Sequence, residues 1–398
     1  MTERSMRLVF ASHTWMGGPF VVGSHHLSVQ LAAMGHQVLH LSTPVTPAHL
    51  LKAGNADASG RMRAWLHGGI VRRHGVIDYV PMSLFPWALV KKFVRSGRNP
   101  FLATMPGLRR ALERLGFGQA DALMVDQPRF VTLERLLNPA HLIYRATDLY
   151  AEMTDDAATA SAERALAQRA DALVATSEPV LSHLRHLAPD KPWLLLENGV
   201  EYDHFANSSP TVATPSSEIE AWMAPVVYVG ALDERFDFSA IEALARGLPE
   251  VRILLVGPHS EDVRKRMAVH ANILLPGARP YAALPAILQR ATVGVLPLSD
   301  HPANKGRSPM KLYEYAAAGL PVVARHTPEL SRRNQDFVHL YQSSDELVSL
   351  VDRLLKHPVD RRAVQAMALP HAWSTKAEML LRMIQEGLKT APAPGAPR

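Results

Sequence analysis

The chain has 398 residues, of which 47% are hydrophobic and 20% charged, an ordinary composition for globular domains. The length predicts two domains, and the absence of any run of about 18 apolar residues argues against a membrane span. There are no cysteines, which excludes disulfides, thiolate catalysis and cysteine–zinc sites and favours a cytoplasmic protein.

The first residues predict a strand, a loop, a helix and a second strand. The strands are expected at 6–11 and 38–41 and the helix at 24–34, which makes a βαβ unit, the beginning of a parallel, doubly wound sheet. The loop holds Gly17 and Gly18, which would let a substrate approach the backbone closely. A tight turn without a ligand is the alternative.

A basic segment follows. Between Arg61 and Arg114, eleven lysines and arginines stand against two acidic residues, so the local excess is larger than the net charge of +6 on the whole chain. Residues 84–114 mix these cations with aromatic and aliphatic side chains, as in amphipathic segments that lie on an anionic membrane surface. A helix packed on the sheet with a solvated basic face is the alternative. Nucleic acid is not an expected partner, because no helix-turn-helix, zinc or RNP signature is present.

The rest of the first half predicts more strands and one long helix at 148–169. Asp148 stands where the strand 141–145 runs out, and doubly wound sheets bind their ligands at the carboxyl ends of strands. A helix N-cap is the other role for Asp148, and the two roles are compatible. The remaining strands are expected at 121–126, 171–175 and 193–196.

A change of composition divides the chain. Residues 204–224 are polar and proline-rich and predict a linker between a first domain, 1–203, and a second, 225–373. The second domain repeats the alternation of strands and helices, so a site is expected in the cleft between the domains, at the carboxyl ends of the strands. A last helix at 374–388 is expected to pack back on the first domain, and the tail 389–398 is expected to be disordered.

The segment 308–324 predicts a loop, a helix, a turn and a strand. Gly319 fits a left-handed helix stop, and the apolar residues after it predict a buried strand. Lys311 and Glu314 lie three residues apart in the first helical turn. They form either a solvent-facing ion pair or part of a nucleotide or phosphate site.

Three features occur together: two Rossmann-like halves, Asn198-Gly199-Val200 before the linker, and Lys311-x-x-Glu314-Tyr315-x-x-x-Gly319-x-Pro321-Val322-Val323 near the end. In these features the chain resembles the GT-B glycosyltransferases over most of its length. The resemblance implies an α/β fold with two Rossmann-like, doubly wound parallel-sheet domains facing across a cleft. The C-terminal domain would bind a nucleotide-sugar and the N-terminal domain an acceptor. Within this fold, Tyr144–Asp148 and Ser308–Leu312 look like the membrane-associated glucuronosyltransferases of xanthan assembly.

The resemblance also implies roles for single residues. Asp148 would be the base that removes the proton from the acceptor hydroxyl. Lys311 would neutralise the diphosphate, and Glu314 would accept hydrogen bonds from the ribose. The other nucleotide-sugar contacts would be Gly230, Leu232, Arg279, Arg307, Ser308 and Met310, and the acceptor contacts would be Gly17, Gly18 and Arg145. No metal or other cofactor is expected, because protein cations would do this work.

One position departs from the pattern. Many retaining relatives carry a Glu eight positions before the residue matching Glu314, and this chain has Gly306 there. The difference favours an inverting reaction with Asp148 as the base. Lys305 or Arg307 would then contact the phosphates.

The expected function is therefore transfer of a sugar from a nucleotide-sugar to a lipid-linked or polysaccharide hydroxyl, in exopolysaccharide or cell-surface glycan assembly. The donor would be UDP-linked, with glucuronate a candidate because Arg279 or Arg307 could pair with its carboxylate. Residues 84–114 would hold the protein on the cytoplasmic face of the inner membrane. The alternatives are a retaining transferase of the same fold, a nucleotide-sugar epimerase, and a non-catalytic module that binds anionic glycans.

Overall fold

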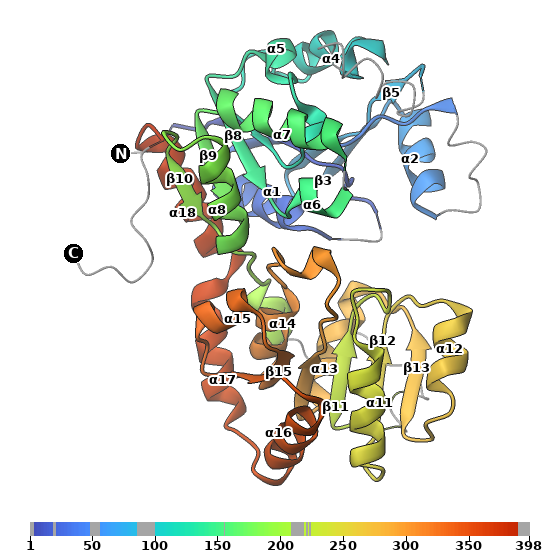
Figure 1. Ribbon diagram of the computed structural model, residues 1–398. Coiled ribbons are helices and arrows are strands. Elements are labelled where there is room, and N and C mark those ends of the chain that lie inside the picture. The colour runs from blue at the N-terminus through green and yellow to red at the C-terminus, as the bar shows by residue number, and fades with distance from the viewer. Residues whose placement is uncertain are drawn as a thin grey trace. The chain divides into compact units, whose positions relative to one another are not determined.

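A computed structural model of the protein describes residues 4–18, 21–47, 56–85, 100–154, 156–207, 219, 222 and 224–388. The chain forms two compact units, which are Met1–Glu197 together with Trp373–Arg398, and Asn198–Ala372 (Figure 1). The division at Asn198 falls inside the predicted first domain, 1–203. Most of the predicted linker and the whole tail lie outside the described residues.

The sheet of the first unit has eight strands in the order β10-β9-β8-β7-β1-β2-β4-β3. Neighbouring strands are parallel, except that β3 runs antiparallel to β4. The strands β2, β4 and β3 lie on one side of β1, and the later strands β7 to β10 lie on the other side. The strands are β1 (Arg7–Ala11), β2 (Gln37–Leu41), β3 (Ile70–Arg73), β4 (Val76–Tyr79), β7 (Ala122–Val125), β8 (His141–Ala146), β9 (Ala172–Ala175) and β10 (Trp193–Leu195). A separate pair joins β5 (Met82–Ser83) and β6 (Thr104–Met105).

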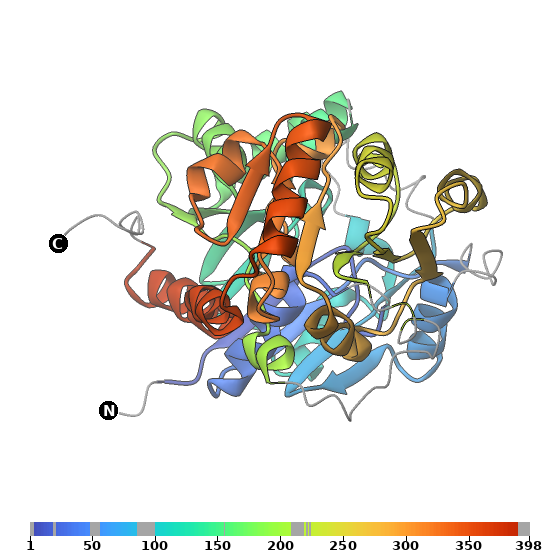
Figure 2. The same cartoon turned by 90° about the horizontal axis from the view of Figure 1, so that it is seen from below.

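Helices cover this sheet. The α1 helix (Gly23–Ala33) packs on α18 (Trp373–Gln385), the helix predicted at 374–388 (Figure 2). The rings of His26 and Trp373 stack between them at 5.0 Å. Inward-facing strand residues such as Val9 and Leu123 belong to a hydrophobic core shared with other helices. The remaining helices of the unit are α2 (Ala56–Leu66), η2 (Pro100–Ala103), α4 (Leu108–Arg114), η3 (Pro128–Phe130), α5 (Glu134–Leu137), α6 (Tyr150–Thr154), α7 (Ala157–Arg169) and α8 (Glu178–Leu187).

The prediction of one helix over 148–169 is wrong. The chain forms α6 and then α7, because Asp156 adopts an extended backbone conformation and caps the second helix. Its Oδ1 accepts the Ala158 N–H at 3.2 Å, which satisfies a donor that a continuous helix would have paired internally.

The second unit has a six-stranded, wholly parallel sheet in the order β13-β12-β11-β14-β15-β16. Figure 1 shows helices α11, α12 and α13 beside its strands. The strands are β11 (Val226–Val229), β12 (Ile253–Val256), β13 (Ile273–Gly277), β14 (Val293–Leu296), β15 (Val322–Arg325) and β16 (Val338–Tyr341). Four of them are buried along their whole length, or nearly so, as expected for parallel strands covered on both faces.

The helices of the second unit pack in two groups. The α11 helix packs on α16, and α14 packs on α9 and α17. Gly319 has φ +81° where α14 ends, which confirms the predicted left-handed stop. The helices are α9 (Tyr202–Ala206), α11 (Phe238–Gly247), α12 (Glu261–Met267), η4 (Tyr281–Ala283), α13 (Leu284–Arg290), η5 (Pro302–Asn304), α14 (Lys311–Ala317), α15 (Pro328–Arg333), α16 (Ser344–Lys356), α17 (Arg361–Ala368) and η6 (Leu369–His371).

The predicted architecture, two doubly wound α/β halves, is confirmed. Within the described ranges, no helix is both long enough and apolar enough to cross a bilayer.

Candidate active site

The strand order of the second unit reverses at β11, which lies between β12 and β14. Ligands of doubly wound sheets bind outside the carboxyl ends of the strands at such a point. The carboxyl end of β11 is Val229, and its main-chain N–H donates to the hydroxyl of Tyr315 on α14 at 2.7 Å. This bond fixes α14, and with it Lys311 and Glu314, against the strand where a ligand is expected.

Gly230 and Gly257 follow β11 and β12, and other protein atoms occupy the space where a side chain of either residue would lie. A Cβ on Gly257 would lie 1.8 Å from the Gly230 carbonyl oxygen, so any side chain there is excluded. A Cβ on Gly230 would lie 2.2 Å from Cε and 2.7 Å from Nζ of Lys311. Gly230 therefore lets the end of the Lys311 side chain lie directly against the backbone, and a side chain at this position would displace it.

Two other cations lie close enough to Lys311 to affect its pKa. Burial lowers the pKa of Lys311 to about 8, and the charges of Arg307 and Arg235 act in the same direction, while Glu314 opposes them. Its ammonium group also lies 5.9 Å from the centre of the Tyr228 ring. Arg235 is paired with Asp233, which raises its pKa, whereas Lys311 is buried beside two like charges. Positive charge concentrated at this edge is suited to an anionic ligand.

The two arginines are held by their loops. Arg235 Nε donates to Asp233 Oδ1 at 2.9 Å, and Arg307 Nη1 donates to Asn304 Oδ1 at 3.2 Å. The side-chain amide of Asn304 donates to the carbonyls of Arg235 and Ser299, both at 2.9 Å. These bonds tie the loop after β11 to the loop after β14 and keep the cations at one place.

The structure gives Ser308 a different environment from the predicted ligand contact. Its buried hydroxyl accepts the main-chain N–H of Asn198 at 3.1 Å and Arg333 Nη2 at 2.8 Å. Arg333 in turn forms a buried ion pair with Glu329, at 2.8 Å from Nε to Oε1. Ser308 therefore holds the loop in position, and this hydroxyl is engaged with the protein itself.

The other predicted donor residues lie in different settings. Leu232 is buried in the hydrophobic core, and its main-chain N–H donates to the Pro258 carbonyl at 3.0 Å. Arg279 lies after the edge strand β13, where Nη1 donates to the carbonyls of Pro276 and Ala278. Met310 is the N-cap residue of α14.

Glu314, in the first turn of α14, is half-buried. Burial raises the pKa of Tyr281, and the charge of Glu314 raises it further, which places the two side chains in one neighbourhood. The charge of Glu314 thus acts on both Tyr281 and Lys311. Of the predicted donor residues, the structure places Gly230, Arg307 and Glu314 near Lys311.

In the first unit, Asp148 follows β8, the strand next to β7. The Thr147 hydroxyl donates to Asp148 Oδ2 at 2.9 Å and lies 2.5 Å from the hydroxyl of Tyr150. Tyr150 donates to the Asp126 carbonyl at 2.8 Å, at the end of β7. Burial raises the pKa of Tyr150, and the charge of Asp148 adds to the shift. Asp148 is thus a half-buried, oriented carboxylate at the carboxyl edge of the sheet.

The predicted acceptor residues have structural roles in this fold. Arg145 is buried and forms an ion pair with Asp126, at 3.3 Å from Nη1 to Oδ1. A Cβ on Gly17 would lie 2.4 Å from the ring of Trp15, which is also why the nearby Gly60 has no room for a side chain. Gly17 is therefore explained by packing, and the Gly18 N–H closes the turn by donating to the Trp15 carbonyl at 3.0 Å.

Sequence reasoning missed several residues of these edges. Arg235 was not selected, although an arginine a few residues after a buried strand is a usable signal. His13 and Gln127 were also missed; they follow β1 and β7, and their contact, 2.9 Å between His13 Nδ1 and Gln127 Nε2, joins residues far apart in the chain.

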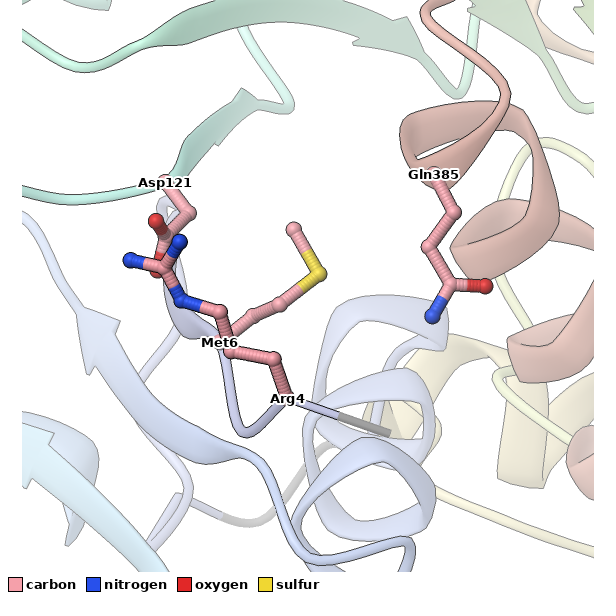
Figure 3. Close-up of a pocket in the computed structure, with 4 residues that line it drawn as sticks. All are labelled: Arg4, Met6, Asp121 and Gln385. Carbon is pink, nitrogen blue, oxygen red and sulfur yellow. The ribbon is translucent and has the colours of Figure 1, made fainter. Parts of the chain in front are cut away.

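A concavity of about 360 Å³ lies elsewhere on the first unit, lined by Arg4, Met6, Asp121 and Gln385 (Figure 3). Met6 and Asp121 immediately precede β1 and β7, so it lies at the amino ends of these strands, away from Asp148. In the described part of the chain, no group of three or more His, Cys, Asp or Glu could hold a metal ion.

Comparisons with known proteins agree with this geometry. Residues 9–176 match the family model "Glucuronosyltransferase GumK, N-terminal domain", and residues 239–381 match "Glycosyl transferase-like". A putative teichuronic acid biosynthesis glycosyltransferase, TuaH of Bacillus subtilis (strain 168), is 26% identical over 312 residues, which are 74% of this chain and 76% of TuaH.

Solved structures share the fold. Sucrose-phosphate synthase from Thermosynechococcus elongatus superposes with a TM-score of 0.66 at 16% identity, over 96% of this chain and 98% of the other. Anabaena Alr3699/HepE, in complex with UDP and glucose, gives 0.67 at 15% identity, over 96% and 100%.

The protein is therefore a glycosyltransferase with the GT-B fold, an enzyme of glycan biosynthesis. Within that class it resembles the glucuronosyltransferase GumK, to whose N-terminal domain model the first unit matches.

Proposed function

We propose that the protein transfers a sugar from a UDP-sugar to a hydroxyl of a lipid-linked or polysaccharide acceptor, with inversion of configuration. The second unit binds the donor, and the first unit binds the acceptor and supplies Asp148 as the base. One observation carries this proposal: Lys311 lies against Gly230 at the end of β11, and Arg307 and Arg235 lie close enough to Lys311 to lower its pKa. HepE structures that contain UDP and UDP-glucose are consistent with such a donor.

The chemistry follows from the charges. When the glycosidic bond of the donor breaks, the nucleotide diphosphate leaves with growing negative charge, which nearby cations stabilise. The acceptor hydroxyl is a weak nucleophile, and a carboxylate within hydrogen-bond reach takes its proton as it attacks. Lys311, Arg307 and Arg235 perform the first task and Asp148 the second. The proposed reaction uses no metal, and a glucuronate donor stays a prediction, since Arg279 and Arg307 both bond to their own loops.

A panel of UDP-sugars tests this function. The protein would be incubated with UDP-glucuronate, UDP-glucose, UDP-galactose or UDP-N-acetylglucosamine, each with and without octyl glycosides of glucose, mannose and cellobiose. We expect one donor to give a glycoside heavier by one sugar residue, seen by mass spectrometry, and NMR to show an anomeric configuration opposite to that of the donor. An epimerised UDP-sugar formed without a glycoside would contradict the proposal.

The segment 84–114 is proposed to contact an anionic membrane. Its residues 86–99 lie outside the described part of the chain. In the described remainder, Leu108, Ala111 and Leu112 are buried in the core, as the alternative reading expected, whereas Arg109, Arg110 and Arg114 are exposed. Leu84, Phe85 and Met105 are 50%, 50% and 58% exposed.

Leu108, Arg109 and Arg110 are among the residues that line a concavity of about 540 Å³. It is lined by Phe101, Gly107, Leu108, Arg109, Arg110, Glu113 and Leu136. Apolar side chains next to arginines suit a surface of anionic lipid.

Replacing Arg109 and Arg110 with Gln should weaken binding to phosphatidylglycerol vesicles. Each basic residue near such a surface contributes about 1 kcal/mol, so the pair should cost about 2 kcal/mol, or about thirtyfold in partitioning. Sedimentation with vesicles measures this. Arg72 and Arg73, which are exposed on β3 in the same basic segment, provide a matched double-Gln control. Equal losses from both pairs would contradict a specific contact at Arg109 and Arg110.

A further inference from the structure

The sheet of the first unit has its own point of reversal, at β1, which lies between β2 and β7. Ser12 and His13 follow β1, Asp126 and Gln127 follow β7, and Asp148 follows β8. The three strands are parallel neighbours, in the order β8-β7-β1, so these residues share one edge of the sheet.

His13 is exposed, yet its position is fixed. Its main-chain carbonyl accepts Arg61 Nη2 at 2.8 Å and the Thr43 hydroxyl at 3.1 Å. Arg61 is itself buried, and its Nη1 bonds to the Thr43 carbonyl and hydroxyl. A buried arginine thus anchors the backbone of a histidine whose side chain remains accessible.

The contact with Gln127 determines what the imidazole can offer. The amide Nε2 of Gln127 lies 2.9 Å from His13 Nδ1, and an amide nitrogen can only donate. Nδ1 therefore accepts, and the neutral ring carries its proton on Nε2. The exposed ring thus has a hydrogen-bond donor whose direction Gln127 sets.

His13 and Asp148 lie on either side of the end of β7. Adjacent strands are about 4.8 Å apart, so residues after β1 and β8 are about 10 Å apart, with the end of β7 between them. Both are tied to that strand: His13 through Gln127, and Asp148 through Thr147, Tyr150 and the Asp126 carbonyl. A sugar ring lying over the end of β7 would reach both side chains.

We propose that His13 is an acceptor-binding residue, whose imidazole Nε2–H donates a hydrogen bond to an oxygen of the acceptor sugar beside Asp148. This inference rests on the proposed function, in which the first unit binds the acceptor. The ligand class is a neutral, hydroxyl-bearing pyranoside. Arg129, which is exposed on η3 two residues after Gln127, adds positive charge to the same edge.

Two substitutions separate acceptor binding from a structural role. In His13→Gln the side-chain amide nitrogen takes the place of Nε2 and the partner of Gln127 is lost. In His13→Asn a polar group remains near Nδ1 but the donor at Nε2 is lost. If His13 binds the acceptor, the Asn variant should raise the KM for the glycoside about five- to tenfold, the usual effect of one neutral hydrogen bond. The Gln variant should stay within about twofold, and the KM for the UDP-sugar should not change.

The assay uses the full chain, the octyl glycoside and the UDP-sugar that support transfer in the panel above, with Kd for UDP and Tm measured alongside. An unchanged KM for the glycoside in the Asn variant, together with a raised KM in the Gln variant, would overturn the proposal. That result would mean that His13 serves to hold Gln127 in place. An equal rise in the KM for the UDP-sugar, or no change in the KM for the glycoside, would also overturn it. Normal UDP binding with no transfer to any glycoside by the unchanged protein would overturn the proposed function, and this inference with it.

Discussion

Replacing Asp148 with Asn should lower kcat by about 10²–10⁴-fold, the usual contribution of a positioned general base. The substitution keeps the size of the side chain, so the bond from Thr147 can persist, but an amide cannot take a proton from the acceptor hydroxyl. Transfer measured with the donor and glycoside from the panel gives kcat, and calorimetry with UDP gives the donor affinity. In the proposed mechanism Asp148 acts on the acceptor, so the Kd for UDP should not change.

Glu152 provides the matched control for Asp148. It is an exposed carboxylate on α6, four residues further along the chain, and Glu152→Gln removes the same charge. This variant should keep kcat within about twofold, since exposed surface substitutions usually have small effects. A similar fall in kcat in both variants would contradict a base at Asp148. It would show instead that kcat depends on the negative charge of this region. Weaker binding of UDP by Asp148→Asn would also contradict the assignment.

Replacing Lys311 with Met should raise the Kd for UDP about ten- to hundredfold. A hydrogen bond to a charged group contributes about 1.5–3 kcal/mol, and each 1.4 kcal/mol is about tenfold. Met keeps the length and apolar stem of the side chain and removes only the ammonium group. Binding of uridine, which has no phosphate, should not change. Calorimetry with UDP and uridine measures the difference.

In the unchanged protein, UDP affinity should depend on pH, because pH sets the charge of Lys311. Burial lowers the pKa of Lys311 to about 8, and a bound diphosphate favours the charged form. UDP affinity should therefore be full below pH 8 and fall as the pH rises above it, and the Met variant should lack this fall. Lys265, an exposed cation on α12 of the same unit, is the control, and Lys265→Met should bind UDP nearly normally. Equal losses at Lys265 and Lys311 would contradict a specific site.

Gly230→Ala extends this prediction. The added Cβ would lie 2.2 Å from Lys311 Cε and 2.8 Å from the Tyr228 hydroxyl, so the lysine must move. UDP affinity should fall, as in Lys311→Met, although the charge of the protein does not change. Normal affinity in the Ala variant would show that the position of the ammonium group is unimportant.

The sequence alone determined the alternation of strands and helices, and from it the two doubly wound sheets. Buried parallel strands are short apolar runs, and the turns between them carry glycine and proline, so both signals are local. The same locality placed Lys311, Glu314 and Asp148 correctly just after strands or at the start of a helix. The break between α6 and α7 was missed, because it depends on one capping aspartate inside a helix-favouring stretch.

Only the tertiary structure decided which of the selected side chains are available to a ligand. Ser308 is bonded to Asn198, 110 residues earlier, and to Arg333, 25 residues later. Arg145 is paired with Asp126 in the core, and the room at Gly17 is filled by Trp15. Burial and pairing depend on residues that are far apart in the sequence and close in space. A local sequence pattern gives no information about such partners. For the same reason, the sequence does not predict that Arg235 and Arg307 lie near Lys311. Their proximity depends on the contact between the loop after β11 and the loop after β14.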